Sequence, residues 1–444
     1  MNHKLYKDKK VGIWGFGKTG QSVLTFVAPH AEKVTVFESA PLSEAQLLLL
    51  KHHNALLVPE GYLEQFLEFN DIIIPSPGID LRPYTHWSDS TSLSLSSEGH
   101  RSTHEPRWVS ELDIFAAHVT IKTIAITGSV GKTSTVALLT ELLNRCGIRA
   151  IAGGNIGTPM LDLIAQQHEY DVIVLELSSF QLEQSHSFAP SIAAVTNLFP
   201  NHLDRHGDLA EYARAKGNLL LHQQEDDWAI IPFEFLEAFI PFTAHQKVLW
   251  LAQDAYLEII STELLDITFA QNWQLIFAIV EQWGIEVNTA LAQCASLTIP
   301  EHRFEKVGTI NGITFYNDSK ATIAESMLES VARLKAQPIL LFLGGLDKGV
   351  DRAPSIAQLP KNIVHVFCFG KEAEAIHQLC KKNKLTSSAH ETLEEGWEEC
   401  KGLAQAGDTV LFSPAGASYD LFKNYEERGN VFKKLVKEFS STQV

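Results

Sequence analysis

Short apolar segments rich in β-branched residues recur along the whole chain, and each of them ends in a polar loop. Longer stretches of helix-forming composition lie between them. Continuous apolar runs of this length are typical of buried parallel strands, and their alternation with helices predicts doubly wound α/β folds. Ligands bind beyond the carboxyl ends of such strands, so the polar loops are the candidate sites. The expected strands are residues 34–37, 71–74, 123–127, 171–175, 192–196, 313–316, 338–343, 364–370 and 409–412.

The loop after the strand expected at 123–127 carries the most specific pattern in the chain. It reads Gly128-Ser129-Val130-Gly131-Lys132-Thr133-Ser134 and leads into a helix-forming run, 136–143. Backbone N–H groups of such a loop cradle phosphate oxygens, while Lys132 reaches the terminal phosphates and the Thr133 hydroxyl can bind Mg²⁺. The glycine spacing is shorter than in the general P-loop, and the alternative is a glycine turn that happens to precede a lysine. We expect ATP to bind here.

Three side chains in neighbouring loops are candidates for the same site. Glu176 ends the strand expected at 171–175, where an acid beside a P-loop strand can bind Mg²⁺. Asn155 lies in a glycine-rich loop and can donate to a ligand. His202 follows the next expected strand in a polar loop, which favours a functional histidine over a core one. The composition around Lys216, by contrast, is that of an ordinary solvated helix lysine.

A second glycine pattern, Gly15-x-Gly17-x-x-Gly20, follows an apolar strand near the N-terminus. About 20 residues later Glu38 ends the next strand, which is the spacing of a dinucleotide-binding fingerprint with an acid for a ribose hydroxyl. This pattern alone also fits any βα turn, and it indicates a nucleotide diphosphate rather than NAD in particular. The strand expected at 71–74 leads into Ser76-Pro77-Gly78 at the same predicted edge.

A third α/β region begins near Pro300 and repeats the arrangement of polar loops at strand ends. Asp318 and Lys320 follow one expected strand, Lys348 follows another and Ser418 follows a third. Taken singly, each of these lysines is as consistent with a solvated surface as with a binding site.

Composition and charge narrow the class of protein. The chain has 444 residues, 45% apolar and 20% charged, and we expect three domains, 1–107, 108–299 and 300–444. We interpret the serine-rich, aperiodic stretch from 86 to 107 as a loop near the first boundary. A net charge of −17 argues against a nucleic-acid partner or a polybasic membrane patch. The five cysteines form no C-x-x-C pair, and no signal peptide or membrane-spanning run is evident, so we expect a cytoplasmic protein without membrane insertion.

The P-loop, the diphosphate-type loop and the third set of strand ends together resemble the Mur ligases of bacterial cell-wall synthesis. The resemblance covers nearly the whole chain and rests on residues 128–133, 176–182, 317–322 and 413–418, with 76–79 in agreement. It implies an α/β protein of three domains: a Rossmann-like UDP-binding domain, a P-loop ATPase-like central domain and a Rossmann-like C-terminal domain.

The resemblance also implies an activity. Family members with these motifs are ATP-dependent amide ligases that attach D-glutamate to UDP-N-acetylmuramoyl-L-alanine through an acyl phosphate, releasing ADP and phosphate. It implies ATP and two Mg²⁺ ions as cofactors, and we expect a monomer.

Roles of single residues follow from the positions that match the family. Lys132, His202 and Lys216 are implied as catalytic, with Lys216 carbamylated so that its new carboxylate helps to hold the second metal. The implied Mg²⁺ ligands are Thr133, Glu176, His202 and Lys216. The implied ATP contacts are Gly128, Ser129, Gly131, Lys132, Thr133, Ser134, Arg303, Asp318 and Lys320. The implied contacts of the UDP substrate are Lys18, Thr19, Glu38, Ser39, Ser76, Pro77, Gly78 and Asn155. Those of D-glutamate are Thr322, Lys348, Ser418 and Tyr425.

Three other functions stay open at this point. A ligase of the same superfamily that adds another amino acid, such as a folate-type polyglutamate ligase, would differ in its amino-acid pocket. A nicotinamide-dependent oxidoreductase built on residues 15–20 would leave the P-loop and the third domain unexplained. A non-catalytic nucleotide-binding regulator would release no phosphate when both substrates are added.

Overall fold

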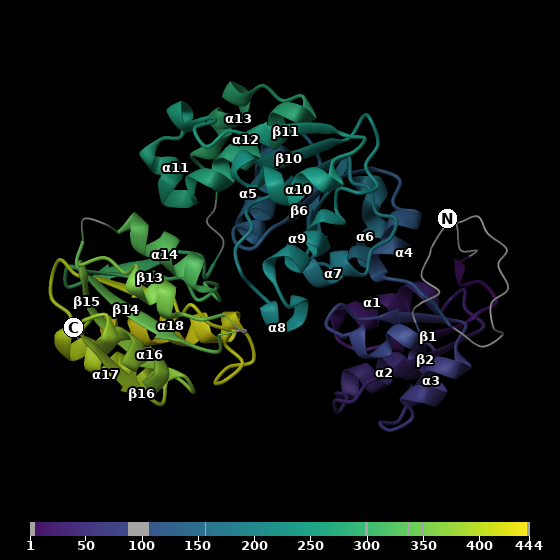
Figure 1. Ribbon diagram of the computed structural model, residues 1–444, viewed down its shortest axis with the longest axis horizontal. Helices are drawn as coiled ribbons and strands as arrows, with labels where there is room; N and C mark the ends of the chain where they lie inside the picture. Colours follow the sequence, from purple (N-terminus) through teal and green to yellow (C-terminus); the bar gives the residue numbers. More distant parts are fainter. Residues whose placement is uncertain are drawn as a thin grey trace. The chain divides into compact units, whose positions relative to one another are not determined.

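The computed structural model contains three β-sheets, each covered by helices (Figure 1). It describes residues 5–87, 106–155, 157–297, 301–334, 337–347 and 350–441. Contacts divide the chain into two compact units, one formed by Met1–Leu198 with Ala213–Leu297 and the other by Phe199–Tyr212 with Thr298–Val444. The first unit holds two of the sheets and the second unit holds the third.

The N-terminal sheet has five parallel strands in the order β3-β2-β1-β4-β5. Trp14, Phe37, Phe66 and Trp108 form much of its aromatic core. The strands are β1 (Lys10–Trp14), β2 (Lys33–Phe37), β3 (Leu56–Val58), β4 (Ile72–Pro75) and β5 (Arg107–Trp108), and the helices α1 (Lys18–Val27), α2 (Glu44–His52) and α3 (Leu63–Phe69).

The central sheet has six parallel strands in the order β11-β10-β9-β6-β8-β7, and its core is built largely from helices α5 and α12. Its strands are β6 (Lys122–Thr127), β7 (Ala150–Gly154), β8 (Val172–Glu176), β9 (Ile192–Val195), β10 (Trp228–Pro232) and β11 (Lys247–Leu251). The main helices of this part of the chain are α4 (Glu111–His118), α5 (Lys132–Arg145), α6 (Met160–Gln166), α7 (Ser179–Glu183), α8 (Leu203–His206), α9 (Leu209–Gly217), α10 (Leu236–Phe239), α11 (Thr262–Ile267), α12 (Ala270–Trp283) and α13 (Val287–Cys294).

The C-terminal sheet has six strands in the order β12-β13-β17-β14-β15-β16. All neighbours are parallel except β12 and β13, which form an antiparallel pair at one edge. Its strands are β12 (Glu305–Ile310), β13 (Ile313–Asn317), β14 (Ile339–Gly344), β15 (Ile363–Phe369), β16 (Ser387–His390) and β17 (Thr409–Phe412). Its helices are α14 (Ala324–Arg333), α15 (Ala353–Ala357), α16 (Ala373–Lys382), α17 (Leu393–Leu403) and α18 (Tyr425–Ser441).

Every apolar segment expected to be a strand is one. Most of these strands are buried along their length and need a continuous apolar run, whereas β13 alternates buried and half-buried residues. The first sheet extends to Trp108, one residue past the predicted boundary, since Trp108 pairs with Ile73. Of the predicted loop at 86–107, residues 88–105 lie outside the described residues. Within the described chain, no helix combines the length and the apolar character needed to cross a membrane.

Candidate active site

The P-loop is shaped by two glycines that no other residue can replace without strain. Gly128 and Gly131 have φ of +140° and +85°, a backbone region that side chains disfavour. A Cβ on Gly128 would collide with the Thr196 hydroxyl, and one on Gly131 would collide with the Asn272 amide oxygen. The close approach of β9 and α12 therefore fixes the path of the loop.

Asn197, which the sequence did not single out, holds the loop from the neighbouring strand end. Its Oδ1 accepts hydrogen bonds from the backbone N–H of Ser129 (3.2 Å) and of Val130 (2.8 Å). The Thr196 hydroxyl donates to the Val130 carbonyl at 2.6 Å. The signal that could have revealed Asn197 is its position after β9, which lies beside β6 in the sheet.

The N-terminus of α5 provides the anion-binding groups. Helix α5 has no side-chain cap at its N-cap residue, Gly131. The first-turn N–H groups and the positive end of the helix dipole are thus directed at whatever the loop encloses. The Lys132 ammonium donates to the carbonyls of Gly128 (2.8 Å) and Ser129 (3.0 Å), so this cation lies over the loop. These groups fit a polyphosphate.

Glu176 and Thr133 form the oxygen pair expected of a magnesium site. The pairing of Ile126 with Glu176 places the end of β8 beside the P-loop strand. The Thr133 hydroxyl donates to the Glu176 carboxylate at 2.6 Å, and the Asn155 amide donates to its other oxygen at 2.9 Å. Mg²⁺ is commonly held by one or two carboxylates together with substrate phosphates and water. This pair fits that pattern, and among the described residues no group of three or more His, Cys, Asp or Glu forms a metal cage.

Lys216 lies beneath the loop. Its side chain is 1% exposed, and its ammonium nitrogen donates to the Gly128 carbonyl at 2.8 Å. Burial lowers the pKa of Lys216 to about 7, although the charge of Glu176 acts to raise it. The composition-based interpretation of Lys216 as a solvated lysine is therefore wrong, because the fold of α9 turns it into the interior. A substantial share of the amine is neutral near pH 7.

His202 belongs to the other compact unit and is half-buried. It precedes α8 with a left-handed φ of 56°. Its predicted role as a metal ligand stays a prediction.

The N-terminal glycine loop meets two other strand ends at one edge of its sheet. Gly15 has φ of +93°, and its carbonyl accepts a hydrogen bond from the Ser76 hydroxyl at 3.2 Å. The Glu38 carboxylate accepts from the N–H of Phe16 at 2.7 Å and from that of Ala40 at 3.0 Å. The predicted UDP-substrate contacts of this domain therefore gather at this edge, whereas Asn155 lies at the P-loop. Lys18, Ser39 and Gly78 are exposed, and Thr19, Ser76 and Pro77 are half-buried.

In the C-terminal domain Asp318 ties three segments together. Its carboxylate accepts hydrogen bonds from the hydroxyls of Ser330 (2.6 Å) and Ser413 (2.9 Å) and from the N–H of Phe304 (3.2 Å). Burial raises the pKa of Asp318 to about 6, while these hydrogen bonds and the nearby charge of Arg303 act to lower it. Of the predicted D-glutamate contacts, Ser418 is buried and Thr322 is half-buried. Lys348 lies outside the described residues.

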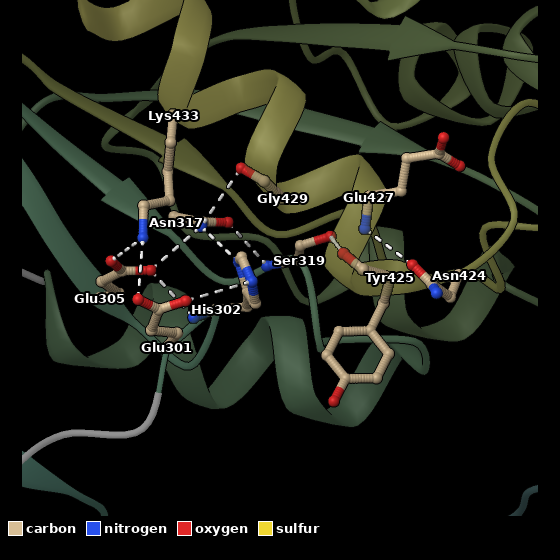
Figure 2. A network of polar contacts seen from close by, with 10 residues as sticks. All are labelled: Glu301, His302, Glu305, Asn317, Ser319, Asn424, Tyr425, Glu427, Gly429 and Lys433. Carbon is tan, nitrogen blue, oxygen red and sulfur yellow. Dashed lines mark hydrogen bonds and ion pairs between the residues drawn. The ribbon is translucent and has the colours of Figure 1, made fainter.

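Figure 2 shows the polar network that positions the start of α18. Asn317 Nδ2 contacts His302 Nδ1 at 2.9 Å and Glu305 at 3.2 Å, and Glu305 is paired with Lys433 at 2.6 Å. The Ser319 hydroxyl donates to the Tyr425 carbonyl at 2.8 Å. The network thereby joins the loop after β13 to the Tyr425 turn. The Lys320 ammonium consequently lies 3.6 Å from the centre of the Tyr425 ring, which brings two predicted site residues together.

Comparison with known proteins identifies the family. Residues 126–249 match the model of the Mur ligase middle domain, and residues 302–416 match that of the Mur ligase, glutamate ligase domain. The UDP-N-acetylmuramoylalanine--D-glutamate ligase of Geotalea uraniireducens (strain Rf4) is 30% identical over 459 residues, which cover 97% of each chain. This chain belongs to the UDP-N-acetylmuramoylalanine--D-glutamate ligase family. A member from Oleidesulfovibrio alaskensis is 35% identical over 375 residues, covering 82% of this chain and 79% of that protein.

Solved structures support the same fold. The MurF ligase of Thermotoga maritima, determined in complex with ADP, superposes with a TM-score of 0.55 over 98% of this chain and 97% of that chain, at 15% identity. Identity this low speaks for the fold alone. The predicted fold class and the predicted membership of the Mur ligases are both confirmed.

Proposed function

We propose that the protein is an ATP-dependent ligase that joins D-glutamate to UDP-N-acetylmuramoyl-L-alanine in peptidoglycan precursor synthesis. The observation that carries the proposal is the similarity to D-glutamate ligases along nearly the whole chain. The P-loop supports the same chemistry, because Lys132, Thr133 and Glu176 converge on one phosphate-binding turn.

The reaction we propose has two steps. The substrate carboxylate attacks the γ-phosphate of ATP, its oxygen forms the new P–O bond, and ADP leaves. The D-glutamate amine then attacks the acyl phosphate, phosphate departs, and the amine loses a proton. Negative charge spreads over the transferred phosphoryl group, where Lys132 and the N–H groups at the start of α5 can stabilise it. Mg²⁺, when bound, supplies further charge neutralisation, and Thr133 and Glu176 are the side chains that would hold it.

We propose that Lys216 is carbamylated. The neutral amine forms a bond to the carbon of CO₂ and releases a proton, giving a carbamate whose negative charge replaces the positive charge of the ammonium. A lowered pKa favours this reaction, because only the neutral amine is a nucleophile. The carbamate would supply a ligand for a second Mg²⁺, and we propose from the family resemblance that His202 is also a metal ligand.

We further propose one substrate for each domain. Residues 1–107 would bind the UDP moiety, residues 108–299 would bind ATP, and residues 300–444 would bind D-glutamate. The remaining assigned side chains keep the roles given by family resemblance, including Asn155 at the muramoyl substrate and Arg303 and Lys320 at ATP. The scattered cysteines fit a reducing cytosol, and we propose that the protein acts there as a monomer.

Phosphate release from MgATP tests this function. We expect release only when UDP-N-acetylmuramoyl-L-alanine and D-glutamate are both present, with one amide formed for each phosphate. Phosphate release with another amino acid, and none with D-glutamate, would show that the protein is a ligase of different amino-acid specificity. Nucleotide binding without any release would identify a regulator, and binding of NAD in a titration would favour the oxidoreductase alternative.

A further inference from the structure

Two buried arginines of the C-terminal domain lie against the same pair of glycine loops. The loops follow β14 and β17 and are locked together by hydrogen bonds between the backbones of Leu346 and Ala417 (2.8 and 2.9 Å). A Cβ added to Gly345 would lie 3.0 Å from Arg428 Nη1, and a Cβ added to Gly416 would lie 2.6 Å from Arg352 Nη2. The glycines thus make room for both guanidinium groups directly below the two loops.

Arg428 uses its donors within the protein. Its Nε donates to the Ser319 hydroxyl at 3.1 Å, its Nη1 to the Gly416 carbonyl at 2.9 Å and its Nη2 to the Ser319 carbonyl at 2.6 Å. Each of the three nitrogens of this guanidinium therefore has an acceptor. These hydrogen bonds hold the loops after β13 and β17 together and leave few N–H donors of Arg428 for a ligand.

Arg352 differs from Arg428, because two of its three guanidinium nitrogens have no hydrogen-bond acceptor among the described residues. Its Nη2 donates to the Gly345 carbonyl at 2.5 Å and pairs with Glu372 at 3.2 Å. Its Nε and Nη1 are buried without a hydrogen-bond partner among the described residues, and the side chain is only 8% exposed. A buried guanidinium keeps its charge, and unsatisfied buried donors are costly. The charges of Glu372, Asp347 and Asp420 already act on this cation. Its Nε and Nη1 still lack hydrogen-bond acceptors, which the oxygens of a bound ligand would supply.

We propose that Arg352 binds the side-chain carboxylate of the acceptor amino acid and so selects a dicarboxylic acceptor. The inference rests on the proposed function and concerns the same amino-acid site. The loops above Arg352 lead to Ser418, a predicted contact of D-glutamate. Guanidinium groups are well suited to carboxylates because they donate charge-assisted hydrogen bonds from several nitrogens.

The geometry of the reaction indicates which carboxylate is bound. The attacking amine must face the acyl phosphate, and the α-carboxylate is attached to the same carbon as that amine. The side-chain carboxylate is the group that can extend away from the reacting atoms. Arg352, which is buried below the loops, is therefore expected to bind the side-chain carboxylate and not the α-carboxylate.

The test compares D-glutamate with D-glutamine, its neutral isostere, in Arg352→Met and in the wild type. We expect the ratio of the two kcat/KM values to fall at least tenfold in Arg352→Met, mainly through KM for D-glutamate. Arg352→Lys, which keeps the charge and loses the planar fork, is expected to retain part of the preference. An unchanged ratio in Arg352→Met would overturn the inference.

Arg428→Lys is the matched control, because it perturbs the same loops from the other side. A purely structural effect lowers activity with both amino acids by the same factor, and we expect that result for Arg428→Lys. If the wild type forms no amide with D-glutamate, the proposed function fails before the inference is reached.

A crystal structure of the wild-type protein with D-glutamate decides the matter even if Arg352→Met does not fold. We expect a carboxylate oxygen of the amino acid within hydrogen-bond distance of Arg352 Nε or Nη1. Bound D-glutamate with Arg352 still paired only to Glu372, Gly345 and water would refute the assignment.

Discussion

At the scale of single residues, the most unusual group in the described part of the ATP-binding region is Lys216. A lysine with no exposed ammonium and a pKa lowered to about 7 is poorly suited to a surface role. It is well suited to reaction with CO₂, because its neutral form is accessible at ordinary pH. The same burial makes the resulting carbamate dependent on nearby positive charge.

Replacing Lys216 with alanine tests this interpretation. We expect kcat to fall by about 10²–10³-fold, the typical effect of removing one preorganised electrostatic group, and acetate to restore part of the lost rate. ¹³C-NMR in ¹³C-bicarbonate should show a carbamate signal in the wild type that is missing from the variant. Lys122→Ala, at an exposed lysine of β6, is the control. Full activity of Lys216→Ala without added CO₂ or acetate would rule the role out.

At the scale of elements, the P-loop depends on the strand next to it. Asn197 follows β9 and accepts from two consecutive N–H groups of the loop. Loss of this side chain leaves the buried Val130 N–H without its acceptor, which costs about 1–3 kcal/mol. The Ser129 N–H keeps a second acceptor, the backbone carbonyl of residue 197, at 3.2 Å. The orientation of the phosphate-binding turn is thus set from outside the P-loop motif.

Asn197→Ala should therefore weaken ATP binding and lower the melting temperature together. Asn197→Asp keeps an accepting oxygen, removes the amide that donates to the Val130 carbonyl at 3.1 Å and adds a negative charge to the loop. We expect it to bind ATP better than the alanine variant does in isothermal titration. Equal ATP affinity in Asn197→Ala and the wild type would contradict this account of the loop.

The packing of α4 on α6 brings a buried carboxyl group into the first unit. Glu111 is buried on α4, and its Oε1 has no hydrogen-bond partner within the described chain. Burial raises the pKa of Glu111 to about 8, with the charge of Asp162 adding to the effect. The folded protein therefore holds a proton on Glu111 at pH values where the unfolded chain has lost it.

This proton makes stability depend on pH. Glu111 contributes to the free energy of unfolding in full at pH values below its pKa in the unfolded chain, about 4.3. This stabilisation is lost as the pH rises toward its pKa of about 8 in the folded protein. Over that interval the free energy of unfolding should fall by about 1.4 kcal/mol per pH unit from this group. Glu111→Gln should remove the slope, as measured by urea unfolding from pH 5 to pH 8. Glu169→Gln, at an exposed side chain, controls for the change of charge; an equal slope in Glu111→Gln and the wild type would contradict the prediction.

At the scale of the whole molecule, nucleotide binding and stability are linked through the first unit, which contains the P-loop. A ligand that binds only the folded state stabilises it, by about 2.7 kcal/mol at a free concentration 100 times its Kd. MgATP should therefore raise the melting temperature of this unit in calorimetry. Lys132→Met should abolish most of the shift, and a shift of the same size in both proteins would mean that ATP binds elsewhere.

Much of the molecule could be predicted because its signals are local. The apolar strands, the glycine turns and the order of the elements depend on neighbouring residues in the chain, and Gly128 and Gly131 are required by the backbone itself. Thr133 and Glu176 were also predictable, since the ends of adjacent parallel strands meet at one edge. The composition around Lys216 predicted an exposed lysine, which is wrong, because the burial of a helix position depends on what packs against it.

The sequence by itself therefore determined the α/β class, the phosphate-binding loop and the ligase family, all of which are encoded in short contiguous patterns. Only the tertiary structure decided which side chains support those patterns. Asn197 meets Val130 across 67 positions, Lys216 meets Gly128 across 88, and Arg428 meets Ser319 across 109. Such contacts have no local signature, because the free energy of a buried charge or amide depends on the acceptors that the fold brings to it.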